Sequence, residues 1–224
     1  MKDAGNGERG TGTDRLREAL RLVVILDDVA AAGRDLAELA AAVVRGGATM
    51  LQVRGKQTAP GPLADITRRV MAAAGSVPVV VNDRLDVALA AGAAGCHLGQ
   101  DDFPISEARG MVPAAFLLGG SAGTADEARH ATRSGAQYLG VGPIRATGNK
   151  ADAGNAIGPA GFASVREATH LPCVAIGGIQ PSDIGALLDA GAAGVAVIGA
   201  ALNSPDVESA VRLLARQMAR SGTP

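Results

Sequence analysis

Four stretches of one pattern decide the fold of this chain: GGATMLQV (46–53), AGAAGCHL (91–98), SGAQYLGV (134–141) and AGAAGVAV (190–197). In each stretch a glycine ends a helical segment, and a small residue and a short apolar run follow it. The four glycines are Gly47, Gly92, Gly135 and Gly191. Glycine is the residue expected at a left-handed helix cap, because it has no Cβ to clash there. Each stretch is therefore predicted to pass from a helix directly into a buried strand.

Four more apolar runs lie between these repeats: LVVIL (22–26), PVVVN (78–82), FLLGGS (116–121) and PCVAIGG (172–178). The segments that separate the runs show helical apolar spacing. Eight strand–helix units result, and a repeat of two units closes naturally into a ring after four copies. The sequence thus predicts an α/β protein of the (β/α)8 TIM-barrel type. A doubly wound sheet uses the same alternation and is the alternative fold.

The composition fits one large barrel domain, which we expect over residues 16–220. The chain has 224 residues, of which 47% are hydrophobic and only 2% aromatic, with no Trp. Such a core must be packed from Val, Leu, Ile and Ala, as buried parallel strands favour. Residues 1–15 are rich in Gly and mixed charge, and we expect them to form a disordered N-terminal tail.

Charge and hydropathy exclude several classes of function. The formal net charge of −1 argues against nucleic acid or an anionic membrane as the main partner. No apolar run reaches the roughly 18 residues of a membrane span, and the N-terminus lacks the apolar core of a signal peptide. Cys96 and Cys173 lie in apolar runs, as reduced core thiols do. We expect a cytoplasmic protein.

The run Gln52-Val53-Arg54-Gly55-Lys56 ends the second predicted strand. Alternate residues of a strand face the same side, at a rise of about 3.3 Å per residue. Gln52, Arg54 and Lys56 would therefore form one polar row at the mouth of the barrel. Two cations in such a row suit a polyanion such as diphosphate. Ordinary solvated surface charge is the alternative interpretation of this run.

Carboxylates follow the next two predicted strands. Asn82-Asp83 ends the third strand, and Asp101-Asp102 follows the fourth. Neighbouring strands lie about 4.8 Å apart, so Asp83 and one of the latter two are expected to reach a shared cation. Two carboxylates, phosphate oxygens and water are the usual ligands of Mg²⁺. Helix capping by these aspartates is the alternative.

Glycine-rich loops follow the last three predicted strands and indicate a second anion site. They are GPIRATGNK (142–150), GGI (177–179) and the region of Ile198 and Gly199. Backbone N–H groups in such loops bind phosphate, and barrels of this type commonly place a phosphate after strands 7 and 8. His97 and Tyr138 have the pattern of packed core residues, and nothing in the sequence indicates a covalent nucleophile.

Taken in order, several motifs resemble the thiamine phosphate synthase family over residues 20 to 215. They are QVRGK (52–56), VNDRLDVALAAGAAGCHLGQDD (81–102), GGS (119–121), YLGVGPIRATGNK (138–150) and AIGGI (175–179). The resemblance implies a transferase of thiamine biosynthesis that joins hydroxymethylpyrimidine diphosphate to hydroxyethylthiazole phosphate and releases diphosphate. It also implies a Mg²⁺ cofactor and small-molecule partners, and it leaves room for a homo-oligomer.

The resemblance also implies roles for individual residues. Catalysis would fall to Arg54, Lys56, Ser121 and Lys150, and Mg²⁺ to Asp83 and Asp102. The substrates would be bound by Gln52, Val53, Arg54, Gly55, Lys56, Asn82, Ser121, Thr147, Gly148, Asn149, Lys150, Gly178, Ile198 and Gly199.

The chain departs from the family pattern at four positions. Arg145 stands where an aromatic or apolar residue is usual, Asn149 and Gly199 stand in place of hydroxyl residues, and Gly55 replaces an acidic residue. Three of the four surround the expected thiazole phosphate. Two other functions of the same superfamily therefore remain alternatives: a thiazole tautomerase-like isomerase and a non-catalytic barrel that binds a phosphate ligand.

Overall fold

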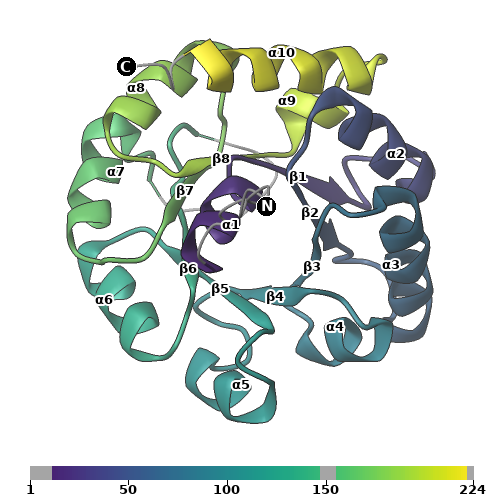
Figure 1. Cartoon of the computed structure of the whole chain (residues 1–224), viewed down its shortest axis with the longest axis horizontal. Coiled ribbons are helices and arrows are strands. Elements are labelled where there is room, and N and C mark those ends of the chain that lie inside the picture. The colour runs from purple at the N-terminus through teal and green to yellow at the C-terminus, as the bar shows by residue number, and fades with distance from the viewer. Residues whose placement is uncertain (1–11, 147–154, 221–224) are drawn as a thin grey trace, which may run out of the picture.

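The structure, a computed structural model, describes residues 12–146 and 155–220 and shows a closed barrel of eight parallel strands in chain order (Figure 1). The strands are β1 (Leu22–Asp27), β2 (Met50–Arg54), β3 (Val79–Asn82), β4 (Gly95–Leu98), β5 (Leu117–Ala122), β6 (Tyr138–Val141), β7 (Cys173–Ile176) and β8 (Gly194–Val197). Because β1 pairs with β8, the sheet has no edge and the doubly wound alternative is excluded.

Helices surround the barrel on its outer side (Figure 1). They are α2 (Leu36–Gly46), α3 (Pro60–Ala74), α4 (Leu85–Ala91), α5 (Ile105–Met111), α6 (Ala125–Arg133), α7 (Gly158–Glu167), η1 (Pro181–Asp183), α8 (Ile184–Asp189), α9 (Gly199–Leu202) and α10 (Val207–Arg220). No helix of the described ranges is both long and apolar enough to cross a membrane.

The predicted strands and their glycine entries are confirmed. Each of the eight apolar runs coincides with one strand of the barrel, and β1, β2 and β5 extend one residue past the run. The glycines of the four repeats all have positive φ: +106° at Gly47, +73° at Gly92, +96° at Gly135 and +87° at Gly191. At Gly47 and Gly92 the cap N–H also donates back to carbonyl groups of the preceding helical turn. The repeat pattern therefore predicted both the strands and the way the chain enters them.

Helix α1 (Gly12–Ala19) corrects the expected N-terminal tail. Residues 12–15 belong to this helix, so the expectation of disorder is wrong for them, and residues 1–11 lie outside the described part. Leu16 and Ala19 pack on the apolar residues inside the barrel, and Figure 1 shows α1 lying across the barrel opening. The helix forms because it covers these apolar residues, and the composition of the N-terminal segment alone did not reveal this contact.

The core has two layers, as the alternation of strand residues requires. The larger layer lies between the strands and the outer helices and includes Val53, Cys96 and Leu139. The smaller layer fills the inside of the barrel and includes Ile25, Val80 and Tyr138. On β2 to β5 the inner residues nearest the carboxyl ends of the strands are polar. This arrangement leaves a cavity there.

Candidate functional site

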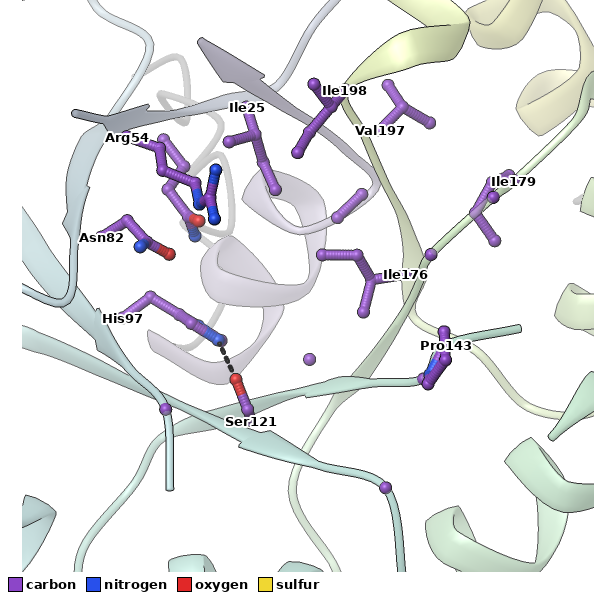
Figure 2. A pocket seen from close by; sticks show the side chains of 18 of the residues that line it. Ile25, Arg54, Asn82, His97, Ser121, Pro143, Ile176, Ile179, Val197 and Ile198 are labelled. Carbon is purple, nitrogen blue, oxygen red and sulfur yellow. Dashed lines mark hydrogen bonds between the residues drawn. The ribbon is translucent and has the colours of Figure 1, made fainter. Parts of the chain in front are cut away.

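A cavity of about 1070 Å³ opens at the carboxyl ends of the strands, where barrels of this type place their chemistry. Every strand contributes to its lining: Ile25, Gln52, Asn82, His97, Ser121, Gly140, Ile176 and Ala196 lie on β1 to β8 respectively. Figure 2 shows that its two sides differ. Arg54, Asn82, His97 and Ser121 lie on a polar side, and Ile176, Ile179 and Val197 lie opposite.

The predicted polar row of β2 lies on the cavity wall. Gln52, Arg54 and Lys56 all line the cavity, with Gln52 buried and the Lys56 side chain half exposed. β2 ends at Arg54, so Lys56 lies in the loop beyond the strand. Among the described residues that line the cavity, Arg54 and Lys56 are the two with an Arg or Lys side chain, and both lie on the same side. The row therefore gives the cavity a wall with two cations, the cationic wall, in which each cation is paired with a carboxylate: Arg54 with Asp27 and Lys56 with Asp83.

Asp27, at the end of β1, holds Arg54 in place and was missed by the sequence reasoning. Its Oδ2 accepts a hydrogen bond from the Arg54 guanidinium. Its Oδ1 accepts from the backbone N–H groups of Val29, at 3.1 Å, and Ala30, at 2.8 Å. The available signal was the acidic end of the first apolar run, directly beside the strand that carries Arg54. Because Asp27 is tied to the backbone, it orients the guanidinium.

Val53 and Gly55, which we expected to bind substrate, are not among the described residues that line the cavity. Val53 is fully buried in the layer between the strands and the helices. A Cβ at Gly55 would lie 2.5 Å from Leu63 Cδ1 of α3. Both positions alternate with Gln52, Arg54 and Lys56 and therefore face the helices. The side chain of Val53 therefore lies away from the cavity, and substrate binding at these two positions stays a prediction for their backbone groups alone.

Asp83 and Asp102 lie at one edge of the cavity, beside Lys56. The Lys56 Nζ lies 2.6 Å from Asp83 Oδ2. Asp102 Oδ2 accepts a hydrogen bond of 2.7 Å from the Gly99 N–H. Neither aspartate caps a helix: the N-cap residues of α4 and α5 are Arg84 and Pro104. The capping alternative is therefore excluded, and Asp102, rather than Asp101, pairs with Asp83.

The backbone of Asp83 is itself unusual. Its φ is +64°, a left-handed conformation that costs a non-glycine residue energy and that occurs preferentially at functional sites. Its N–H donates to the His97 carbonyl at 2.8 Å, which ties the end of β3 to β4. The turn directs the carboxylate toward Lys56 and Asp102.

The two carboxyl groups influence each other's pKa in opposite directions. Burial raises the pKa of Asp102, and the hydrogen bond and negative charge of Asp83 raise it further. Burial also acts to raise the pKa of Asp83, but the hydrogen bonds from Asp102 and Lys56 bring it below its ordinary value. Asp83 is therefore the ionised member, and Asp102 keeps its proton to a higher pH than an ordinary aspartate.

This pair is the metal-binding candidate of the described part of the chain, where no group of three or more His, Cys, Asp or Glu side chains converges. Mg²⁺ is usually held by one or two carboxylates together with substrate phosphates and water. A cation would replace the proton that the two carboxyl groups share. The donor set of Asp83 and Asp102 therefore fits Mg²⁺ when a phosphate substrate completes the coordination.

Behind the polar wall, His97 connects the cavity to the barrel interior. Its Nε2 lies 3.1 Å from Ser121 Oγ, the bond drawn in Figure 2, and its Nδ1 lies 3.3 Å from the Tyr138 hydroxyl. A Cβ at Gly119 would lie 2.3 Å from Tyr138 Cζ and 2.5 Å from His97 Nδ1. The absence of a side chain at this position gives the network its space. His97 is thus a buried residue, as predicted, that also lines the cavity.

The opposite side of the cavity has the predicted neutral character. Gly178, Ile198 and Gly199 all line it, together with Gly177 and Ala146. The expected binding residues Thr147, Gly148, Asn149 and Lys150 lie outside the described residues. The described part thus brings Gly178, Ile198 and Gly199 to the lining of the same cavity as Arg54 and Lys56.

Comparison with known proteins agrees with this geometry. The family model described as thiamine monophosphate synthase matches residues 22–201. The thiamine-phosphate synthase of Methanospirillum hungatei is 44% identical over 202 residues, covering 89% of this chain and 98% of that protein. The thiamine-phosphate synthase of Moorella thermoacetica is 43% identical over 202 residues, covering 89% and 96%.

Solved structures give the same result. Thiamine phosphate pyrophosphorylase from Pyrococcus furiosus matches with a TM-score of 0.85 and 33% identity, covering 93% of this chain and all of that one. A 3-hexulose-6-phosphate synthase, at TM-score 0.69 and 20% identity, covers 88% of this chain and 99% of its own and shows the shared fold alone. Sequence, family model and barrel thus agree that this chain belongs to the thiamine monophosphate synthase family.

Proposed function

We propose that this barrel is a thiamine phosphate synthase, which joins hydroxymethylpyrimidine diphosphate to hydroxyethylthiazole phosphate and releases diphosphate. The observation that carries the proposal is the division of one cavity into two unlike sides. Arg54, Lys56 and the pair Asp83 and Asp102 line one side, and neutral glycine-rich loops line the other. Two different phosphate-bearing substrates need such a division.

The cationic side would bind the pyrimidine diphosphate. In the reaction, the C–O bond between the pyrimidine methylene and the diphosphate breaks, so negative charge grows on the leaving group. Arg54 and Lys56 lie where they would stabilise that charge, and cations already held in position need no reorganisation as the charge develops. When bound to Asp83 and Asp102, Mg²⁺ would supply further positive charge to the phosphate oxygens.

The amide of Asn82 and the hydroxyl of Ser121 would contact the pyrimidine diphosphate between these charges and the barrel floor. Ser121 is oriented on two sides: His97 binds its hydroxyl, and the Gln100 side-chain amide donates to its carbonyl at 2.7 Å. Gln52 would contribute its amide below Arg54. We propose that Lys150, outside the described residues, adds a third cation to the leaving group.

The neutral side would hold the thiazole phosphate. Gly178, Ile198 and Gly199 lie after β7 and β8, at the usual phosphate position of such barrels. We propose that Thr147, Gly148 and Asn149 complete this site. The thiazole ring nitrogen would then face the pyrimidine methylene and form the new C–N bond. Holding both substrates in one geometry contributes more here than a strong general base.

The purified protein, both substrates and Mg²⁺ provide the direct test, with thiamine phosphate and diphosphate measured by chromatography. We expect both products in equal amounts, and neither after chelation of the metal. A thiazole tautomerase would instead interconvert thiazole phosphate isomers without diphosphate release, and a non-catalytic barrel would form no product. Either result would overturn the proposal.

The remaining expectations on setting are part of the same proposal. We propose that the protein works in the cytoplasm on small molecules alone, without nucleic acid or membrane; the family resemblance leaves room for a homo-oligomer. The free thiols of Cys96 and Cys173, both buried, support a reducing compartment.

A further inference from the structure

An ion pair connects the loops after β6 and β7 beside the neutral side of the cavity. Arg145 lies in the loop after β6, and Asp183 lies in η1, which follows β7. The guanidinium donates two hydrogen bonds to the carboxylate: Nε to Oδ2 at 2.9 Å and Nη2 to Oδ1 at 2.6 Å. The Asp183 side chain is 10% exposed and that of Arg145 is 55% exposed. The two-point geometry gives the pair directional specificity that a single contact lacks.

Arg145 is not placed to bind substrate. Of the two neighbouring loop residues, Ala146 lines the cavity and Arg145 does not. Its guanidinium is directed at Asp183 and makes both of its hydrogen bonds there, outside the cavity lining. The simplest interpretation of an additional arginine near a phosphate site, a further cation for that phosphate, therefore does not fit the structure.

The pair instead closes a ring of contacts around the turn at Gly177 and Gly178. The Arg145 N–H donates to the Gly177 carbonyl at 2.9 Å, so the backbone contacts of β6 and β7 continue past both strand ends. Asp183 Oδ2 also accepts from the Gln180 N–H at 2.9 Å, which fixes the start of η1. Both ends of the glycine turn are thereby attached to the same ion pair.

The turn is packed tightly against the same arginine. Gly177 and Gly178 have φ values of +93° and +67°, which favour glycine. A Cβ at Gly178 would lie 2.7 Å from Arg145 Cβ and 3.1 Å from the Ala146 carbonyl oxygen. A movement of Arg145 is therefore transmitted directly to the backbone that lines the cavity.

We propose that Arg145 is a positioning residue that, together with Asp183, sets the geometry of the Gly177–Gly178 turn and thereby the affinity for the phosphate of the second substrate. The inference rests on the proposed function for the identity of that substrate. It explains a departure from the family pattern, since Arg145 stands where an aromatic or apolar residue is usual. This chain uses a charged contact between two loops at this position.

The test compares Arg145→Met, Asp183→Asn and the double variant with Arg129→Met as the matched control. Arg129 forms an exposed ion pair with Asp126 on α6, outside the cavity lining. Arg145→Met should raise the KM for thiazole phosphate about tenfold, because small displacements of a binding group are costly. The KM for the pyrimidine diphosphate should change less than twofold, and the control should match the unmodified protein.

The double variant and Arg145→Lys distinguish the ion pair from general packing. The double variant should be no worse than Arg145→Met, because the two residues act through one contact. Arg145→Lys keeps the charge but loses the two-point geometry, so it should recover only part of the affinity. Equal increases in both KM values, or an unchanged thiazole phosphate KM, would overturn the inference.

Hydrogen exchange separates this inference from the proposed function. Amide exchange in a peptide that spans Gly177 and Gly178 should be faster in Arg145→Met than in the unmodified protein, with no substrate present. If the unmodified protein makes no thiamine phosphate, the function fails, and this measurement alone still decides whether the ion pair holds the turn. Unchanged exchange there would overturn the inference even in an active enzyme.

Discussion

The ion pair between Asp27 and Arg54 provides a quantitative test of how the cationic wall is built. Asp27→Asn removes the charge but keeps an oxygen that accepts from the Val29 and Ala30 N–H groups. The amide NH2 group then faces the guanidinium, and because both groups are hydrogen-bond donors, no hydrogen bond forms between them. Arg54 remains in place as a buried cation without its counterion.

The exposure of the two side chains sets the expected magnitude. Removing one partner of a buried pair costs about 3–5 kcal/mol. Asp27 is 4% exposed, and Arg54 is 13% exposed at the cavity. Because water reaches Arg54 from the cavity, we expect the lower end, about 3 kcal/mol in the free energy of unfolding. At roughly 2–4 °C per kcal/mol for a domain of this size, Tm should fall by about 6–12 °C.

Urea unfolding followed by circular dichroism measures this change. The matched control is Asp65→Asn, which breaks an exposed pair with Arg68 and should cost less than about 1 kcal/mol. Adding Arg54→Met to Asp27→Asn should recover most of the lost stability, because no unpaired charge then remains. A loss below 1 kcal/mol in Asp27→Asn, or no recovery in the double variant, would refute the reasoning.

Three further predictions concern the interior and the metal pair. Because the folded pKa of Asp102 is raised, its stabilising contribution is present at low pH and is lost as the pH rises through that raised pKa, so the metal-free protein should become less stable there. Asp102→Asn should remove this pH dependence in thermal melts and abolish turnover. An active Asp102→Asn variant would exclude the metal role. Gly119→Ala should lower the free energy of unfolding by about 1–3 kcal/mol through contact with Tyr138 and His97, and unchanged urea curves would contradict it. Burial raises the pKa of Cys96 above its ordinary value and that of Cys173 to about 11, so iodoacetamide should modify both far more slowly in the folded than in the unfolded protein, as mass spectrometry would report; equal rates would contradict the burial.

The strands were predictable because short stretches of local sequence specify them. A glycine with positive φ and a short aliphatic run specify a helix end and a buried strand without any distant partner, as at Gly92 and 95–98. Closure of the barrel followed from the number of repeats. Helix α1 was not predictable in this way, because its apolar residues are recognised only once the barrel interior that they cover exists.

The site was predictable where a side chain ends a strand, as Arg54 and Asn82 do. It was less predictable where the structure pairs residues from distant parts of the chain. Asp27 and Arg54 are 27 positions apart, and Arg145 and Asp183 are 38 positions apart. Val53 differs from these cases, since the alternation of a strand already directs its side chain to the helices.

The position of Tyr138 has a practical consequence for spectroscopy. The chain contains one Tyr and no Trp, so near-ultraviolet absorption and emission at tyrosine wavelengths come from this residue. Its hydroxyl contacts His97, whose other ring nitrogen contacts Ser121 at the cavity wall. The protein thus carries a single tyrosine whose hydroxyl is two contacts away from Ser121 at the cavity wall. Titrations followed by tyrosine fluorescence would report the occupancy of the cavity without a label.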